Sequence, residues 1–351
     1  MAVKQAPRPL SFYQALPKVE LHRHLEGSLR VKTLMETAAA YNIPTNGIAA
    51  LRSLVQVGDH DPYTYQNILS KFAVLRQFYR SPEIIERITR EAIEDAAQDN
   101  VRYLELRFTP VALSRAGNFP LAEVIDRVIA GAQAGQDAWG LTTRLIVSVN
   151  RHESTGLAEK VAHLAADRID KHIVGLDLAG NEAEFSAKPF VGIFREARQS
   201  GLKITVHAGE WDGAANVVEA IEELSAMRIG HGVRVLEDQR AVALALERAI
   251  PFEVCLTSNY HSGVVASLDA HPLRHLLDLG LNISLNADDP SISNITLGDE
   301  FYLASERLGL PLSVLGNCIA AGARAAFLPK KEKTALLASI QTEFSSWINV
   351  G

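Results

Sequence analysis

The stretch Leu281-Asn282-Ile283-Ser284-Leu285-Asn286-Ala287-Asp288-Asp289-Pro290 begins with an apolar run and ends in polar and acidic residues. Short, nearly continuous apolar runs of this kind are typical of parallel strands that are buried on both faces. Similar β-forming runs precede it along the chain, and segments with helical periodicity separate them. Eight strands that alternate with helices favour a (β/α)8 TIM barrel of the α/β class.

The expected strands and helices alternate from the first strand to the last. We expect strands at residues 18–21, 101–108, 142–149, 173–178, 203–207, 228–231, 251–256 and 281–285. The clearest helices between them cover residues 82–98, 121–138, 156–171, 189–200, 214–226, 237–248 and 271–279. A doubly wound sheet is the alternative, but no G-x-G-x-x-G sequence follows the first strand to support a dinucleotide site.

The length of the chain leaves one domain or two open. Its 351 residues are 47% hydrophobic and 22% charged, which is ordinary for a globular protein and excludes fibrous, disulfide-rich and disordered classes. No Ser/Gly/Pro-rich linker and no repeat divides it, so we expect a single domain over residues 1–351. We expect an N-terminal helical lid insertion with about three helical segments before residue 101, including residues 65–79. Three further helical stretches are expected after the eighth strand, ending in residues 330–348.

The charge of the chain argues against polyanionic partners. Lys and Arg number 35 against 41 Asp and Glu, a net charge of −6, and no basic run stands out. Binding to a nucleic acid or to an anionic membrane is therefore not expected. The two cysteines lie in apolar surroundings and no stretch approaches about 18 apolar residues, which together indicate a cytoplasmic protein.

Ionisable residues follow several expected strands at the same end, and in a barrel these ends meet at the C-terminal mouth. His22 and His24 are two residues apart, so both rings point to one side of an extended strand. His207 ends the fifth strand and Asp288 follows the eighth. Three imidazoles and one carboxylate suit a Zn²⁺ ion that activates a water molecule. The alternative is that these residues are capping or hydrogen-bonded core residues.

Three further residues at these ends are candidates for catalysis or substrate binding. Glu210 is either a carboxylate favoured by the N-terminus of the following helix or a general acid near the metal. His231, which lies between two glycines, has room for a ligand and a tunable pKa. Asp289 is either a helix N-cap or a partner of a polar substrate atom.

Other histidines and the lid give weaker signals. His152 and His261 follow strand ends and are the remaining histidines we expect nearest to a ligand, whereas the others, His271 among them, are expected at the surface or in packing. Asp177 is either a buried, hydrogen-bonded carboxylate or a catalytic group. Aromatic residues of the lid insertion are more often core than pocket, but their position favours contact of Ile68, Leu69 and Phe72 with a ligand.

Motifs spread over nearly the whole chain resemble the adenosine deaminase family. The opening motif is Leu16-Pro17-Lys18-Val19-Glu20-Leu21-His22-Arg23-His24-Leu25-Glu26-Gly27-Ser28. The others follow in the family's order: Glu105-Leu106-Arg107-Phe108-Thr109-Pro110, Asp177-Leu178-Ala179-Gly180-Asn181-Glu182, Thr205-Val206-His207-Ala208-Gly209-Glu210, Arg228-Ile229-Gly230-His231-Gly232 and Ser284-Leu285-Asn286-Ala287-Asp288-Asp289-Pro290.

The resemblance implies a zinc barrel that hydrolyses the 6-amino group of a purine and releases ammonia. It implies one Zn²⁺ per subunit, held by His22, His24, His207 and Asp288. His231 would orient and deprotonate the zinc-bound water, and protonated Glu210 would donate to ring N1.

The same resemblance implies the substrate contacts. Asp289 would bond N7, the Gly180 amide would bond N3, and His24 and Glu26 would also contact the substrate. Ile68, Leu69 and Phe72 match a hydrophobic lid on the ribose side. The partner is therefore expected to be a small purine nucleoside, and the oligomeric state is left open.

Glu26 departs from the family's pattern. Adenosine deaminases commonly carry Asp at this position, which is linked to the ribose hydroxyl, and Glu resembles the adenine deaminase branch. The motifs around Arg107 and Asp177 look nucleoside-type, which favours adenosine or 2′-deoxyadenosine, converted to inosine or 2′-deoxyinosine.

The alternatives are adenine, a 5′-modified adenosine such as aminodeoxyfutalosine or methylthioadenosine, and a catalytically silent nucleoside-binding barrel. A silent barrel would be expected to lose a metal ligand or the pair Glu210 and His231, and all of these are present.

Overall fold

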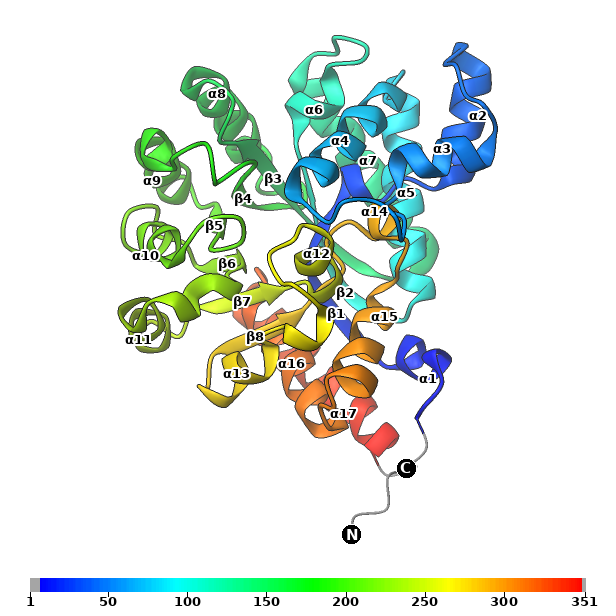
Figure 1. The fold of residues 1–351 in the computed structure, drawn as a ribbon. Helices are drawn as coiled ribbons and strands as arrows, with labels where there is room; N and C mark the ends of the chain where they lie inside the picture. The colour runs from blue at the N-terminus through cyan, green and yellow to red at the C-terminus, as the bar shows by residue number, and fades with distance from the viewer. Residues whose placement is uncertain (1–6, 349–351) are drawn as a thin grey trace.

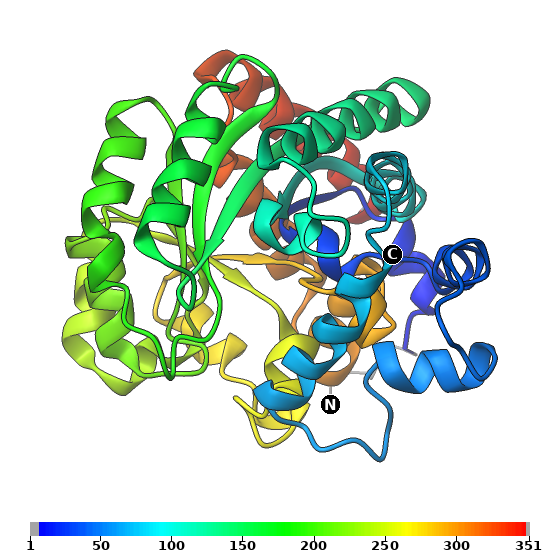
Figure 2. The same ribbon diagram turned by 90° about the horizontal axis from the view of Figure 1, so that it is seen from above.

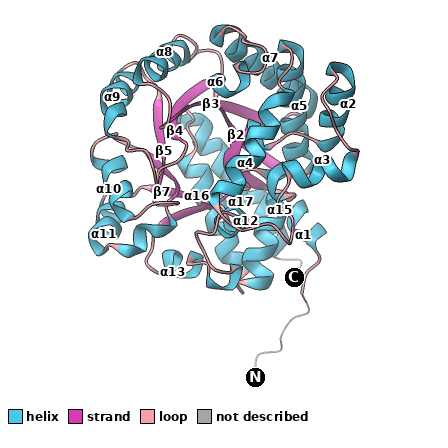
Figure 3. Cartoon of the chain, turned by 45° about the horizontal axis from the view of Figure 1, so that its top comes forward, coloured by secondary structure: helices cyan, strands magenta, loops and turns pink. Residues whose placement is uncertain are grey.

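Eight parallel strands form the centre of the computed structural model, which describes residues 7–348. They are arranged in the order β1-β2-β3-β4-β5-β6-β7-β8. The sheet closes beside β1, where the Asp288 N–H donates to the His22 carbonyl at 3.0 Å and the His24 N–H donates to the Asp288 carbonyl at 2.9 Å. Helices surround this barrel (Figure 1, Figure 3), so the predicted (β/α)8 TIM barrel is confirmed.

The element bounds are as follows. The strands are β1 (Lys18–His24), β2 (Val101–Phe108), β3 (Thr142–Asn150), β4 (Ile173–Ala179), β5 (Lys203–Ala208), β6 (Arg228–His231), β7 (Pro251–Val254) and β8 (Asn282–Leu285). The α-helices are α1 (Leu10–Ala15), α2 (Val31–Tyr41), α3 (Ile48–Val55), α4 (Tyr65–Leu75), α5 (Pro82–Gln98), α6 (Pro110–Ser114), α7 (Leu121–Trp139), α8 (Thr155–Ala166), α9 (Val191–Gln199), α10 (Ala214–Glu222), α11 (Gln239–Glu247), α12 (Leu256–His261), α13 (Leu273–Asp278), α14 (Pro290–Ser293), α15 (Leu297–Tyr302), α16 (Leu312–Ala325) and α17 (Lys330–Ile348). Short helical turns are η1 (Leu25–Gly27), η2 (Arg76–Phe78), η3 (Lys188–Phe190), η4 (Val233–Glu237), η5 (Leu268–Ala270) and η6 (Leu303–Arg307). Residues 1–6 and 349–351 of the expected domain lie outside the described residues.

Capping residues in the sequence set where helix α5 begins. At α5, Ser81 Oγ accepts from the Ile84 N–H at 3.3 Å and Pro82 occupies the first turn, where its missing N–H costs nothing. The buried face of this helix, which includes Ile85 and Ile88, packs against α7 outside the barrel. The capping residues and the buried apolar face of α5 thus both favour the helix that the structure shows.

The ends of two strands differ by two residues or more from the sequence-based expectation. The first strand continues to His24 rather than ending at residue 21. The seventh ends at Val254 rather than at residue 256, because the Glu300 carboxylate accepts from the N–H groups of Leu256 and Thr257 at 2.5 and 3.0 Å. This distant carboxylate starts α12 where the apolar run alone predicted more strand.

The lid insertion is more divided than expected. Four α-helices, α2 to α5, lie between β1 and β2, where about three helical segments were predicted. The predicted single segment at residues 65–79 consists of α4 followed by η2. Four α-helices, α14 to α17, also follow β8 in place of three stretches. Helices α2, α3 and α4 lie on one side of the barrel (Figure 2), and α4 packs on η1 directly after β1.

A charged layer fills the barrel beneath its mouth. Arg228 is fully buried and pairs with Glu105 and with Glu253, whose Oε1 lies 2.5 Å from Arg228 Nε. The guanidinium also lies over the Phe327 ring, 3.5 Å from its centroid. Buried charges are tolerated when each has a close opposite charge.

In the described residues no helix is long and apolar enough to cross a membrane.

Candidate active site

The four predicted metal ligands come together at the C-terminal mouth of the barrel. Asp288 Oδ1 lies 3.2 Å from His22 Nε2 and 3.3 Å from His24 Nε2. His24 Nε2 lies 3.2 Å from His207 Nε2. The alternation of side chains along β1 turns both of its histidines inward, and β5 and β8 supply the other two groups.

These four residues fit a zinc ion. His22 Nε2 and Asp288 Oδ1 are buried and have no hydrogen-bond partner within the described chain. An unpartnered buried polar atom is costly, so such atoms point to a ligand. Zinc binds imidazole nitrogen at about 2.0–2.1 Å in tetrahedral geometry, which spaces its ligand atoms roughly 3.3 Å apart. The donor set therefore has the chemistry and the spacing that this metal requires.

Cys255 is a neighbour that the sequence analysis missed. Its Sγ lies within 4.8 Å of ligand atoms of His22, His231 and Asp288, while His22, His24 and His207 form a second such group. Burial raises the pKa of the Cys255 thiol well above its usual value, and the thiolate is the form that binds metals. The imidazoles and Asp288 are therefore the better donors.

Backbone strain marks the same strand ends. His231 and Asp288 adopt φ values of 59° and 61°, in the left-handed region that side chains other than glycine rarely enter. Each such residue costs about 1–3 kcal/mol, and strained residues cluster at functional sites. Gly27 allows close approach, because a Cβ there would lie 1.9 Å from Asp289 Oδ1. Gly180, which lines the cavity, has a φ of +89°, a backbone conformation that residues with a side chain rarely adopt.

Carboxylates behind the histidines hold the rings in position. Glu253 Oε2 lies 2.7 Å from His22 Nδ1, and Asp177 Oδ1 lies 3.1 Å from His207 Nδ1. Arg107 bridges the two carboxylates, with Nη2 2.6 Å from Glu253 and Nη1 3.5 Å from Asp177. Such contacts orient a ligand histidine and leave Nε2 free for the metal. Asp177 is thus a buried, paired carboxylate, and the sequence signal for Glu253 was a charge inside a buried strand.

Three other carboxyl groups of the site favour the protonated form. Burial, together with the charges of Asp288 and Glu182, raises the pKa of Glu210 well above its usual value. Burial and the charge of Asp288 do the same for the pKa of Asp289, and burial also raises the pKa of Glu26. A protonated carboxyl can donate a hydrogen bond, which a carboxylate cannot.

Hydrogen bonds fix the position of His231. Its Nε2 lies 3.5 Å from Glu210 Oε2, and its Nδ1 lies 3.2 Å from Asn259 Nδ2. Asn259 Oδ1 in turn lies 3.2 Å from Nε2 of His271, which is buried and joined to the site through this amide. The prediction of a surface or packing role for His271 therefore misses this link, because no sequence spacing relates it to His231.

Glu182 holds the turn that carries Glu210. Its carboxylate accepts from the N–H groups of Gly209, Glu210, Trp211 and Asp212 at 2.5–3.0 Å. A carboxylate that accepts several backbone bonds fixes the turn around it. In the sequence, Glu182 stands only as the last residue of one motif, and no spacing predicts this role for it.

One cavity joins the metal donors to the predicted substrate contacts. Its wall includes all seven residues predicted to contact substrate: His24, Glu26, Ile68, Leu69, Phe72, Gly180 and Asp289. It also includes the metal-site and catalytic candidates His207, Glu210, His231 and Asp288. Residues without a predicted role there are Arg76, Thr109, Asn150, Ala179, Trp211, Ser258 and Ser262, and His152, which was expected near a ligand, also lines it. His152 thus reaches the cavity, whereas His261 lies instead against Ser293, with Nδ1 3.3 Å from Oγ.

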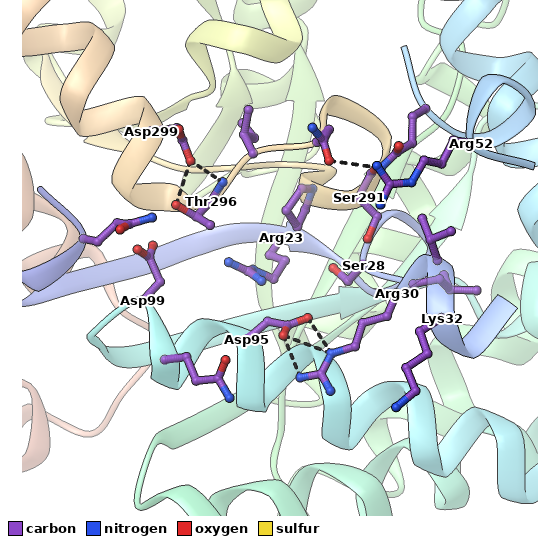
Figure 4. Close-up of a pocket in the computed structure, with 18 residues that line it drawn as sticks. Arg23, Ser28, Arg30, Lys32, Arg52, Asp95, Asp99, Ser291, Thr296 and Asp299 are labelled. Atoms are coloured by element: carbon purple, nitrogen blue, oxygen red, sulfur yellow. Dashed lines mark hydrogen bonds and ion pairs between the residues drawn. The ribbon is translucent and has the colours of Figure 1, made fainter. Parts of the chain in front are cut away.

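A second cavity lies on the opposite side of β1 (Figure 4) and has a volume of about 630 Å³. Arg23, whose neighbours His22 and His24 face the metal site, lines it. Arg30, Asp95 and Asp99 also line it. No motif or spacing in the sequence predicts this cavity.

The family assignment follows from comparison with known proteins. The adenosine deaminase family model matches residues 17–343. The chain belongs to the adenosine deaminase family. It is 36% identical to the adenosine deaminase of Erwinia tasmaniensis over 330 residues, which cover 93% of this chain and 98% of the relative.

Solved structures of related enzymes share the fold over almost the whole chain. An amidohydrolase from Burkholderia ambifaria with bound Zn has a TM-score of 0.90 at 26% identity and covers 100% of this chain and 96% of its own. The adenine deaminase of Arthrobacter aurescens has a TM-score of 0.87 at 26% identity, covering 95% and 100%. The Arabidopsis N6-mAMP deaminase has a TM-score of 0.84 at 28% identity, covering 95% and 99%. The chain is therefore a deaminase of the amidohydrolase superfamily, and its relatives support purine deamination.

Proposed function

We propose that this deaminase is zinc-dependent and hydrolyses the 6-amino group of a purine nucleoside. Adenosine or 2′-deoxyadenosine gives inosine or 2′-deoxyinosine and ammonia. The observation that carries the proposal is the convergence of four metal donors, three of which line one cavity together with Glu210 and His231. We propose one catalytic domain with one zinc ion per subunit, since β1 and β8, from the two ends of the chain, supply a single donor set.

His22, His24, His207 and Asp288 would hold the zinc ion. When bound, zinc supplies a Lewis acid that lowers the pKa of water to about 7. Glu253 and Asp177 would keep the His22 and His207 rings aligned for this role.

Glu210 and His231 would handle the protons of the reaction. Glu210 is held protonated by burial, so it can donate to purine N1 and make C6 electrophilic. Burial lowers the pKa of His231 well below its usual value, so its imidazole is neutral, and in the tautomer with the proton on Nδ1 its Nε2 would accept a proton from the attacking water. The distance of 3.5 Å between the two side chains supports their action on adjacent positions, with donation to N1 and proton acceptance from the water that attacks C6.

The residues of the cavity wall favour a nucleoside over a free base as the substrate. Protonated Asp289 would donate to N7, and the N–H of Gly180 would donate to N3. Glu26 Oε2 is buried and has no hydrogen-bond partner among residues 7–348, while its Oε1 accepts from the Thr109 N–H at 2.7 Å, so Oε2 is available for a ribose hydroxyl. Ile68, Leu69 and Phe72 offer an apolar surface beside it.

The test is a side-by-side assay of ammonia release on purified protein whose zinc content has been measured. The substrates are adenosine, 2′-deoxyadenosine, adenine, methylthioadenosine and aminodeoxyfutalosine. We expect turnover of nucleosides by protein that holds close to one zinc ion per chain. A strong preference for adenine would overturn the nucleoside assignment, and active protein without zinc would overturn the metal assignment.

A further inference from the structure

The active-site cavity holds an arginine to which the proposed reaction gives no role. Arg76, the first residue of η2, lines the cavity from the lid side. Its Nε is buried and has no hydrogen-bond partner within the described chain. The guanidinium carbon lies 6.0 Å from the centre of the Phe72 ring, which also lines the cavity. A buried guanidinium N–H without a partner is unfavourable unless a ligand accepts from it.

A second donor without a partner lines the same cavity. Asn150 ends β3, and its Nδ2 is buried and has no hydrogen-bond partner among residues 7–348. His152 follows two residues later and also lines the cavity, where burial and the charges of Arg76 and Arg115 lower its pKa. All three residues line the cavity, and the charge of Arg76 reaches His152, which follows Asn150 by two residues.

The nearby carboxyl groups leave the charge of Arg76 largely free. Glu153 lies 3.7 Å from Arg115, and burial raises its pKa although the Asn150 side chain and the charges of Arg115 and Arg76 act to lower it, so its uncharged form is favoured. Glu26 is close enough for the charge of Arg76 to lower its pKa, but burial outweighs this and raises the pKa, which favours the uncharged form. An anion beside Arg76 would therefore meet a neutral Glu26 rather than a second negative charge.

We propose that Arg76, Asn150 and His152 form a subsite for an anionic substituent on the 5′ carbon of the nucleoside. The inference rests on the proposed function, in which Glu26 lies at the ribose hydroxyl and the purine lies toward Glu210. The forked guanidinium of arginine suits the paired oxygens of a phosphate or a carboxylate. Asn150 Nδ2 and a ring nitrogen of His152 supply the additional donors that such oxygens require.

The experiment compares substrates that differ only at the 5′ position. Steady-state kinetics of the zinc-loaded enzyme are measured with adenosine, AMP, adenosine-5′-carboxylate and methylthioadenosine. We expect at least one of the two anionic substrates to exceed adenosine and methylthioadenosine in kcat/KM. AMP and adenosine-5′-carboxylate distinguish phosphate from carboxylate as the preferred group.

The variant Arg76→Gln tests the residue itself. We expect kcat/KM for the preferred anionic substrate to fall about 10- to 100-fold, mainly through KM, because a charge-assisted hydrogen bond is lost. Adenosine should change less than about threefold, and Arg76→Lys should restore part of the loss. The matched control is Arg80→Gln, an exposed arginine in the same segment that does not line this cavity.

The outcomes separate this inference from the proposed function. Higher kcat/KM for neutral nucleosides than for both anionic ones overturns the subsite, and so does an equal loss for all substrates in Arg76→Gln. If no purine is deaminated, the proposed function fails. Calorimetric binding of AMP to wild type and Arg76→Gln then decides the subsite, since equal affinities overturn it and weaker binding by the variant supports it.

Discussion

The two cavities on either side of β1 differ in how their buried charged groups are paired. In the second cavity each buried charge has an opposite partner: Arg23 pairs with Glu20 at 2.8 Å and Asp99 lies 3.7 Å from Lys18. Arg30 and Asp95 pair there as well, at 2.6 Å (Figure 4). In the active-site cavity, by contrast, the basic groups that contact Asp288 and Glu210 within the described residues are histidines.

This difference distinguishes charged groups that stabilise the fold from groups that are available to a ligand. Opposite charges that pair with each other need no ligand, so the second cavity is explained by the fold. Carboxyl groups that are buried close together raise one another's pKa, as at Asp289 and Glu210, and buried oxygen atoms of Asp288 and Glu26 have no hydrogen-bond partner among the described residues. The surrounding barrel keeps these groups close together, and their unpartnered atoms are available to a metal ion and a substrate.

The largest expected effect comes from removing the proton of Glu210. Glu210→Gln should lower kcat about 10²- to 10⁴-fold, because the amide cannot transfer a proton to the purine. Zinc content, measured by atomic absorption, should be unchanged. The matched change in the second cavity, Asp95→Asn, should leave kcat within about twofold; a comparable loss in that variant would remove the distinction between the cavities.

The next effect concerns the carboxylates behind the metal donors. Burial would raise the pKa of Glu253, yet the charges of Arg107 and Arg228 hold it well below its usual range, so His22 faces a full negative charge. Glu253→Gln should weaken zinc binding about 10- to 100-fold in competition with a chelator. Unchanged zinc affinity in a variant with native circular dichroism would contradict the positioning role.

A smaller effect is expected from Asp99 in the second cavity. Burial raises its pKa to about 6, although Lys18 and the Gly298 N–H favour the charged form. Because the folded pKa exceeds the unfolded one, its contribution to stability is full below about pH 4 and is lost as the pH rises through about 6. The loss should reach at most about 3 kcal/mol in urea unfolding, and Asp99→Asn should flatten this part of the pH profile.

The smallest effect is expected at the partly exposed pair of Arg30 and Asp95. Their side chains are 31% and 39% exposed, so solvent screens the attraction. Arg30→Gln should lower the free energy of unfolding by no more than about 1 kcal/mol, and by less in 1 M salt. A loss of several kcal/mol would show that this pair is as critical as the buried ones.

Much of the site could be predicted because the barrel places distant strand ends together. His22, His24, His207 and Asp288 were assigned to one donor set from their positions after strands, and the structure brings their ligand atoms to 3.2–3.3 Å. The residues behind them were harder to predict. Glu253 lies in a short apolar strand, and His271 and Asn259 have no regular spacing from His231.

The sequence by itself determined the order of strands and helices, the ionisable residues at the strand ends and the family motifs, since periodicity and spacing are local properties of the chain. The tertiary structure decided which carboxyl groups are neutral, which charges are paired and where Arg76 lies. Those properties depend on burial and on neighbours hundreds of residues away, such as the 231 positions between His22 and Glu253. A pKa or an unpaired donor exists only once the barrel has closed and excluded water from its mouth.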